Sequence, residues 1–423
     1  MALPPITKNE DQKRNVRASF VPPIPDKTEP ARIFPRFRSV LYKVGTTRYN
    51  PLIMTSFTQF DILATLQATL TEKGLTKPTH IQERAIPVLL GGRSIVGIAE
   101  TGSGKTLAYA LPILHKLKSL ELTGDAIKEN GQPRAVIIVP TRELGEQVSK
   151  VFKPFTHTTR IRVRTVLGGT ALEVAKKNIA APFEVLVATP GRIVKLLDRG
   201  LISFSDVRTL VFDEADQMLD QGFLPDANKI VAACPEARQL ALFSATVSGS
   251  VQSLITRLFG DAEVIRSDGS KRLVATLKTE NLEVIDGKRF PLLDRLLKKP
   301  VTGGTMIFTN TRIQCDKLVL ELKKSGRTCV IYRGEMDKIE RRNNLKLFRD
   351  GKIELLVSTD LASRGLDLEH VGRVINYHLP QQIENYIHRA GRTARAGRKG
   401  LVVNLVTERD EALLTQVSKI QHR

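Results

Sequence analysis

The sequence predicts an α/β protein with two similar domains, each built around a parallel sheet. Helical hydrophobic patterns alternate with short runs of β-branched and aliphatic residues, which is the arrangement of βαβ units. These runs fall into two series, and a polar, turn-rich stretch at 267–272 lies between them. With 423 residues, of which 41% are hydrophobic, the chain is long enough for two or three globular domains.

Each expected strand is a short apolar run, and a helical pattern at 62–70 precedes the first of them. The first series lies at 94–98, 135–139, 163–167, 185–188, 210–212 and 240–243. The second series lies at 306–308, 328–332, 354–357, 373–377 and 401–406. We therefore expect a first domain at 55–266, a linker at 267–279 and a second domain at 280–423.

Residues 1–54 differ in composition from the rest of the chain. They contain eight prolines, ten basic and four acidic residues, and they show no sustained hydrophobic period. We expect a disordered basic arm. Two alternatives stay open: a transit peptide, which the acidic residues disfavour, and translated sequence upstream of a natural start at Met54.

The whole chain is strongly basic. It has 65 Lys and Arg against 44 Asp and Glu, a formal net charge of +21. This excess favours a polyanionic partner such as nucleic acid over a merely soluble basic protein. Three cysteines, Cys234, Cys315 and Cys329, lack the paired spacing of a disulfide framework or a zinc site. Since neither a long apolar run nor a secretory signal is present, we expect a soluble, cytoplasmic protein without a membrane partner.

A glycine-rich run follows the first expected strand and is expected to open a helix. It reads Ala99-Glu100-Thr101-Gly102-Ser103-Gly104-Lys105-Thr106. Glycine lets backbone N–H groups approach phosphates, Lys105 can reach the β and γ oxygens, and the Thr106 hydroxyl can bind Mg²⁺. The alternative is a glycine turn that caps a helix, but the strand before and the helix after favour a phosphate site. Ala99 stands where the general motif has Gly.

Two adjacent carboxylates, Asp213 and Glu214, follow the apolar run 209–212. Asp213 can bind Mg²⁺, and Glu214 can orient and polarise an attacking water. Taken alone, the pair is as well explained by a turn or a helix N-terminus. The glycine-rich loop earlier in the chain favours nucleotide hydrolysis.

The second series of strands lacks both a glycine-rich phosphate loop and a pair of adjacent carboxylates. It ends with a run of basic residues from His388 to Arg395. Arg392 and Arg395 are three residues apart, so they share one face of a helical turn, and guanidinium groups stabilise charge that develops during phosphoryl transfer. By itself such a run is more often a polyanion-binding face. Because one half offers a phosphate loop and the other offers arginines, a nucleotide held between the domains would use both.

Further motifs, in order, resemble those of the DEAD-box RNA helicases of superfamily 2 over residues 57–410. They are Thr79-His80-Ile81-Gln82, Pro140-Thr141-Arg142-Glu143-Leu144, Gly168-Gly169, Ser244-Ala245-Thr246 and the run 358–367. The resemblance implies two tandem RecA-like domains with parallel sheets and an ATP site in the interdomain cleft. It also implies ATP hydrolysis on RNA binding, with separation of short RNA duplexes or remodelling of ribonucleoprotein. ATP and Mg²⁺ are the implied cofactors.

The resemblance adds ATP contacts outside the glycine-rich loop, from Phe57, Gln82 and Asp367. Gln82 is expected to read the adenine edge, because an amide can donate and accept at once. Leu75 stands where the family usually has Phe or Tyr stacked on the base. Leucine can only pack against adenine, so we expect a nucleotide affinity below that typical of the family.

The resemblance also implies residues that connect ATP hydrolysis to RNA. Four side chains are expected to form this connection, namely Asp216, Ser244, Thr246 and His388. A larger set is expected to bind RNA through its backbone, without reading bases. This set is Thr141, Arg142, Gly168, Gly169, Thr189, Gly191, Arg192, Thr309, Asn310, Arg341, Thr359 and Gly365.

Two positions depart from the family pattern without removing a charge needed for hydrolysis: Lys338 replaces Gln and Ala394 replaces Gly. Two other functions stay open, an ATP-gated RNA clamp that separates no duplex and a DNA translocase with the same catalytic residues. Asp216 and His388 favour the RNA-directed branch. We expect a monomer that acts on RNA, with ribosomal precursors or degradation complexes among its partners.

Overall fold

The computed structural model describes residues 55–100, 102–247, 249–267, 277–360, 368, 370–394 and 399–421. Some predictions fall outside this part of the chain, namely the expected arm at 1–54 and most of the expected linker. Four expected site residues also lie outside it: Thr101, Gly365, Asp367 and Arg395.

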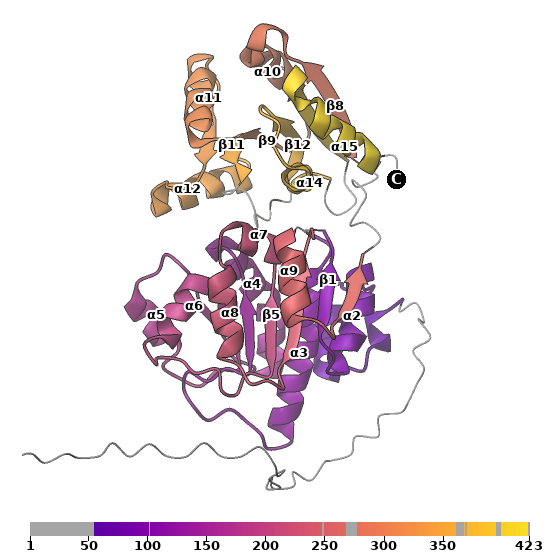
Figure 1. Ribbon diagram of the computed structural model, residues 1–423, viewed down its shortest axis with the longest axis vertical. Helices are drawn as coiled ribbons and strands as arrows, with labels where there is room; N and C mark the ends of the chain where they lie inside the picture. Colours follow the sequence, from indigo (N-terminus) through magenta and orange to yellow (C-terminus); the bar gives the residue numbers. More distant parts are fainter. Residues whose placement is uncertain are drawn as a thin grey trace, which may run out of the picture. The chain divides into compact units, whose positions relative to one another are not determined.

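The first domain contains a seven-stranded parallel sheet with the order β3-β4-β2-β5-β6-β1-β7. Figure 1 labels two of its strands, β1 and β5. Its strands span Ile95–Ile98 (β1), Ala135–Ile138 (β2), Val163–Val166 (β3), Val185–Ala188 (β4), Thr209–Phe212 (β5), Gln239–Ser244 (β6) and Glu263–Arg266 (β7). The first six match the expected runs to within one residue at each end. β7 was not expected, because it is an edge strand in which only Ile265 is buried.

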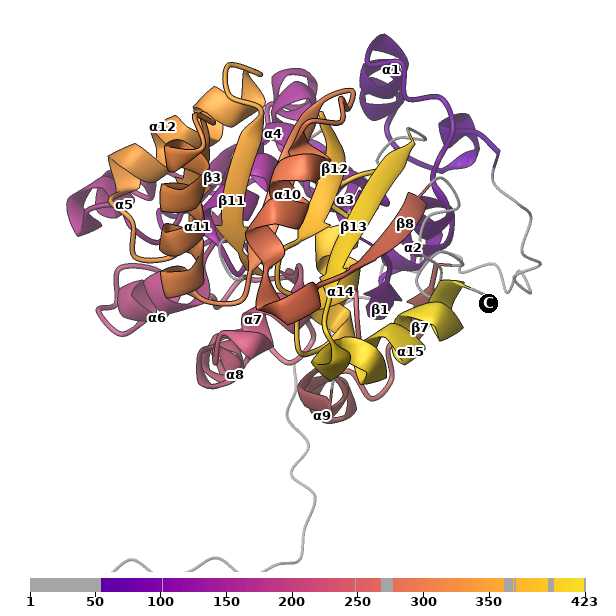
Figure 2. The same cartoon turned by 90° about the horizontal axis from the view of Figure 1, so that it is seen from above.

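The second domain contains a six-stranded parallel sheet with the order β10-β11-β9-β12-β13-β8. Its strands span Leu277–Glu283 (β8), Gly304–Thr309 (β9), Val330–Tyr332 (β10), Leu355–Thr359 (β11), Val371–Asn376 (β12) and Gly400–Val406 (β13). Figure 2 shows β8 at the edge of this sheet beside β13. β8 is largely polar and begins within the range expected to be a linker, so the last residues of that range, 277–279, belong to the sheet.

Helices cover both faces of each sheet, because successive strand residues point to opposite faces. In β1, Ile95 and Val96 belong to different hydrophobic clusters. One face carries α1 (Ala64–Glu72), α2 (His80–Leu90), α3 (Lys105–Leu122) and α4 (Arg142–Thr159). The other carries α5 (Leu172–Asn178), α6 (Pro190–Leu197), α7 (Ala215–Asp220), α8 (Leu224–Ala232) and α9 (Gly249–Leu258).

The second sheet is covered in the same way. One of its hydrophobic clusters includes residues of α10 (Arg289–Leu297) and α11 (Arg312–Lys324). The other includes residues of α12 (Lys338–Arg349), α14 (Ile383–Ala390) and α15 (Glu411–Gln421). Three short 3₁₀ helices complete the described elements, at Phe57–Gln59 (η1), Ile285–Gly287 (η3) and Glu408–Asp410 (η5).

The strand direction brings the sequence motifs together. In a parallel sheet all carboxyl ends lie along one edge, which is where open α/β sheets bind ligands. The glycine-rich loop follows β1, Thr141 follows β2, Thr189 follows β4, Asp213 follows β5 and Ser244 ends β6. Motifs that are far apart in the chain therefore share one edge of the first sheet.

Two general expectations can be compared with the structure. Among the helices in the described part of the chain, none is long and apolar enough to cross a membrane. The three cysteines, Cys234, Cys315 and Cys329, are buried and form no disulfide.

Candidate active site

The glycine-rich loop joins β1 to α3 and forms the beginning of that helix. Gly102 and Gly104 have φ angles of 88° and 89°, in the left-handed region that favours glycine. A Cβ atom on Gly104 would collide with the side-chain amide of Gln82. The loop therefore requires glycine here for both conformation and space, and it leaves backbone N–H groups at the start of an 18-residue helix to face an anion.

Lys105 is folded back into this loop. Its side chain is buried, and Nζ donates a 2.7 Å hydrogen bond to the carbonyl of Ala99. To bind a phosphate as predicted, the ammonium would have to leave this carbonyl. Next to it, burial raises the pKa of Glu100 to about 7, although the positive charge of Lys105 opposes the shift.

Gln82 is bonded to the protein at both ends of its amide. Oε1 accepts from the backbone N–H of Thr79 at 2.9 Å, and Nε2 donates to the carbonyl of Gly104 at 3.0 Å. The Thr79 hydroxyl adds a 2.7 Å bond to the carbonyl of Ser103. Gln82 thus fastens α2 to the glycine-rich loop, and its amide must give up a loop contact to read adenine.

Phe57 and Leu75, two further residues expected to contact ATP, differ in their exposure to solvent. Phe57 is buried in the core, where its ring centroid lies 5.8 Å from that of Phe60. Its backbone N–H donates to the carbonyl of Thr76 at 3.2 Å, which holds the segment after Leu75. Leu75 itself is 40% exposed, so it is the one of the two that a base can contact directly.

Asp213 lies at the end of β5 with both carboxylate oxygens bonded. Oδ2 accepts a 2.8 Å hydrogen bond from the hydroxyl of Tyr109, and Oδ1 accepts the N–H of Glu214 at 3.0 Å. Burial raises the pKa of Asp213 to about 6, with Lys105 opposing the shift. Glu214 has a φ of 51°, an unfavourable conformation for a residue with a side chain, and such outliers concentrate at functional sites.

Asp216, three residues after Asp213, has a much lower pKa than Asp213. Burial alone would raise its pKa, but the contact with His388, the positive charge of Lys105 and the hydrogen bond from Thr246 hold it well below its usual value. Oδ2 of Asp216 accepts the backbone N–H and the hydroxyl of Thr246, at 2.8 and 2.9 Å. Nε2 of His388 lies 3.6 Å from the same oxygen.

The Thr246 hydroxyl therefore bonds the Asp216 carboxylate directly. Ser244 takes part through its Oγ, which accepts the backbone N–H of Asp216 at 3.3 Å and donates to the carbonyl of Thr246 at 2.7 Å. Four side chains from three segments of the chain meet at this point. Arg392, one of the two expected catalytic arginines, is buried four residues after His388. Its Nε donates to the carbonyl of His388 at 3.2 Å.

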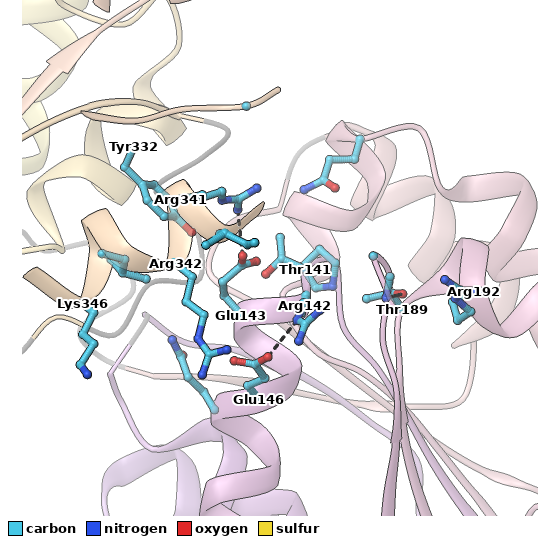
Figure 3. A pocket seen from close by; sticks show the side chains of 18 of the residues that line it. Thr141, Arg142, Glu143, Glu146, Thr189, Arg192, Tyr332, Arg341, Arg342 and Lys346 are labelled. Atoms are coloured by element: carbon cyan, nitrogen blue, oxygen red, sulfur yellow. Dashed lines mark hydrogen bonds and ion pairs between the residues drawn. The ribbon is translucent and has the colours of Figure 1, made fainter. Parts of the chain in front are cut away.

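A cleft of about 1180 Å³ contains most of the expected RNA-binding residues. Eight of the twelve line it, namely Thr141, Arg142, Gly168, Gly169, Thr189, Gly191, Arg192 and Arg341. Figure 3 shows Glu143 facing Arg341, whose Nη2 lies 3.1 Å from Glu143 Oε1, while the guanidinium stacks 4.8 Å from the ring centre of Tyr332.

Three other expected RNA-binding residues do not line this cleft. Thr309 and Thr359 are buried at the ends of β9 and β11. The amide of Asn310 is bonded within the domain, because Nδ2 donates to the carbonyl of Leu379 at 2.7 Å and Oδ1 accepts from Arg389 at 2.9 Å. Both ends of the Asn310 amide are therefore engaged in hydrogen bonds within the second domain.

Comparison with known proteins agrees with this geometry. The family profile of DEAD/DEAH box helicases matches residues 79–254, and that of the helicase conserved C-terminal domain matches residues 288–397. The chain is 33% identical over 370 residues to the DEAD-box ATP-dependent RNA helicase CshA of Geobacillus kaustophilus, covering 88% of this chain and 77% of that protein. It belongs to the DEAD-box ATP-dependent RNA helicase family.

Two further relatives support this membership. The ATP-dependent RNA helicase CshA of Listeria monocytogenes is 34% identical over 366 residues, which is 86% of this chain and 69% of that protein. The solved structure of S. cerevisiae Dbp5 bound to RNA and ADP BeF3 superposes with a TM-score of 0.77 at 28% identity. That match covers 86% of this chain and 93% of the Dbp5 chain.

The DEAD-box motifs did not reveal several basic residues of the cleft. Lys150, Lys195, Arg342, Lys346 and Arg349 also line it. Arg342, Lys346 and Arg349 recur at helical spacing along α12, so they form one exposed stripe, and none of them has an acidic partner within the described part of the chain. This helical spacing of basic residues was the sequence signal that could have identified the stripe.

The donor set of this DEAD-box protein suits Mg²⁺. In the described residues no group of three His, Cys, Asp or Glu side chains is placed to hold a metal. Mg²⁺ does not need such a cage, because it is usually bound by one or two protein oxygens together with substrate phosphates and water. The buried Asp213 carboxylate, whose pKa burial raises to about 6, and the Thr106 hydroxyl are oxygens of this kind.

Proposed function

We propose that this chain hydrolyses ATP on binding RNA and uses the cycle to separate short RNA duplexes or to remodel ribonucleoprotein. The contact between Asp216 and His388 carries this proposal. Asp216 lies two residues after the water-activating Glu214, and His388 begins the arginine-rich motif of the second domain. Because the Asp216 carboxylate contacts both Thr246 and His388, it supports coupling between hydrolysis and the relative position of the domains.

The catalytic roles follow from the chemistry of each side chain. Lys105 binds the β and γ phosphates once it leaves the Ala99 carbonyl, and Glu214 orients and deprotonates the attacking water. Arg392, together with Arg395 outside the described residues, neutralises charge that develops on the transferred phosphoryl group. A bound Mg²⁺ would neutralise phosphate charge, held by Asp213 and Thr106.

RNA recognition is proposed to use the cleft and to be insensitive to base sequence. The cleft offers hydroxyls, glycine N–H groups and arginines, which suit phosphate oxygens. Its basic side chains outnumber its acidic ones, so RNA affinity should fall steeply with salt. The Arg341 guanidinium would have to exchange Glu143 for a phosphate.

Glu214→Gln and Lys105→Ala are the decisive variants. We expect each to abolish RNA-stimulated ATPase activity of the full-length protein, since one removes the base and the other a phosphate ligand. Glu236→Gln, a change at an exposed glutamate, should leave turnover unaltered. Unchanged turnover in purified Glu214→Gln would refute the site.

Two parallel assays separate this function from its rivals. Strand displacement measured beside RNA retention distinguishes a helicase from an RNA clamp, because a clamp retains RNA in the presence of ATP but displaces no strand. Stimulation of the ATPase by DNA as strong as by RNA would indicate a DNA translocase.

The cellular setting is part of the same proposal. We propose a monomer that works in the cytoplasm, depends on Mg²⁺, and acts on ribosomal precursors or within degradation complexes. Three reduced, buried cysteines suit a reducing compartment. Crosslinking the protein to RNA in its own cells would identify the target.

A further inference from the structure

Tyr109 contacts Asp213, the carboxylate to which we assign Mg²⁺. Its phenol donates the 2.8 Å hydrogen bond to Oδ2 of Asp213. Tyr109 lies in α3 three residues after Thr106, so the two residues share one face of the helix. The phenol thus joins the helix after the glycine-rich loop to the carboxylate at the end of β5.

The hydrophobic core holds this phenol in place. Tyr109 is fully buried, and its ring centroid lies 5.4 Å from that of Phe243 in β6 and 6.5 Å from that of Phe152 in α4. These neighbours belong to the packed face of the first sheet. The position of the hydroxyl is consequently set by the fold and does not depend on a nucleotide.

The direction of the hydrogen bond from Tyr109 follows from the protons available. An ionised carboxylate only accepts, so the phenol proton points at Asp213. Asp213 is restrained a second time by the N–H of Glu214, 3.0 Å from Oδ1. Each of its two carboxylate oxygens therefore accepts from a donor that the fold holds in place.

We propose that Tyr109 is a positioning residue of the phosphate and metal site, which orients the Asp213 carboxylate toward Mg²⁺ bound with the nucleotide. The inference rests on the proposed ATPase function. Mg²⁺ demands near-octahedral geometry, so small rotations of its ligands weaken binding. Loss of a partner that orients a metal ligand typically lowers affinity or activity 10- to 100-fold.

Tyr109→Phe tests the proposal, because it keeps the ring in the core and removes only the hydroxyl. The dissociation constant of fluorescent mant-ADP is measured for the full-length protein with Mg²⁺ and with EDTA. The ratio of the two constants is the advantage that Mg²⁺ confers. We expect Tyr109→Phe to reduce this advantage about tenfold and to leave the affinity in EDTA unchanged.

A merely structural role would give a different result. It would weaken mant-ADP binding equally with Mg²⁺ and with EDTA, and that outcome overturns the proposal, as does a full Mg²⁺ advantage in Tyr109→Phe. The matched control is Tyr386→Phe, which removes a buried phenol that accepts from Asn404 at 3.1 Å in the second domain. We expect this control to keep the wild-type ratio.

A double-mutant cycle identifies the residue through which Tyr109 acts. In an Asp213→Asn background, Tyr109→Phe should have no further effect on the Mg²⁺ advantage, since the bond it removes serves Asp213. A fully additive effect would overturn the assignment. If the wild-type protein shows no Mg²⁺-dependent binding of mant-ADP, the proposed ATPase function fails, and this result is distinct from a failure of Tyr109 alone.

Discussion

Arg389 and Asp360 form a two-pronged ion pair in the second domain. Nε of Arg389 lies 2.5 Å from Oδ1 of Asp360, and Nη2 lies 2.7 Å from Oδ2. The other donors of the guanidinium bind Oδ1 of Asn376 at 3.0 Å, the carbonyl of His378 at 2.6 Å and Oδ1 of Asn310 at 2.9 Å. All five N–H groups of a buried arginine are therefore used.

This ion pair decides where the arginine-rich motif lies. Arg389 connects α14 to the segments that follow β9, β11 and β12. His388 is its neighbour in the chain, and Arg392 follows one turn later. His388, assigned to coupling, and Arg392, assigned to catalysis, are thus positioned by a residue that the resemblance did not single out.

We expect Arg389→Lys to lower the free energy of unfolding by about 3 kcal/mol, because an ammonium cannot reproduce the planar fork and leaves buried acceptors unpaired. Urea denaturation measures the loss. Arg295→Lys, at an exposed position of α10, should change stability by no more than about 0.5 kcal/mol. Equal stability of the two variants would show that Arg389 is not a structural centre.

Glu100 should make nucleotide binding depend on pH. Its pKa, raised to about 7 by burial against the opposing charge of Lys105, means that it is neutral in mild acid and negative in mild base. The negative form repels phosphates, so mant-ADP affinity should fall about threefold as pH rises through neutrality. Glu100→Gln should bind more tightly in mild base and lose this component. An identical pH profile in both proteins contradicts the prediction.

Asp213 should lower the stability of the nucleotide-free protein at high pH. Burial raises its pKa from 3.8 to about 6, so its favourable contribution is complete below the unfolded value and is lost as pH rises through the folded one. Asp213→Asn should therefore be about 1–3 kcal/mol more stable than wild type near pH 8, with no gain near pH 4. Denaturation in EDTA measures this, and a less stable variant near pH 8 would refute it.

The stripe of Arg342, Lys346 and Arg349 should contribute phosphate contacts. Changing all three to Gln should reduce the slope of log affinity against log salt by up to about 2, since each lost contact with single-stranded RNA removes about 0.7. Lys317, Lys323 and Lys324, exposed on α11 and outside the cleft, form the matched control when changed to Gln. If both triple variants alter the slope equally, the stripe has no special role.

The sequence predicted the central strands well. β4 was predicted at its observed bounds, because a fully buried parallel strand is a continuous apolar run that can be recognised locally. β7 and β8 were missed, since edge strands are half exposed and their polar residues resemble a linker. The expected meeting of Asp216 with Thr246 and His388 came from the motif resemblance.

By itself, therefore, the sequence determined which residues are the candidates for phosphate, water and RNA chemistry, because glycines, carboxylates and arginines in motif order are a local property of the chain. Only the tertiary structure decided which of them are held by others. Gln82 is bonded to the glycine-rich loop, Asn310 is bonded within its domain, and Tyr109 reaches Asp213 across 104 residues of sequence. Such contacts depend on how packed helices and sheets bring distant segments together, and neither residue of a pair indicates its partner.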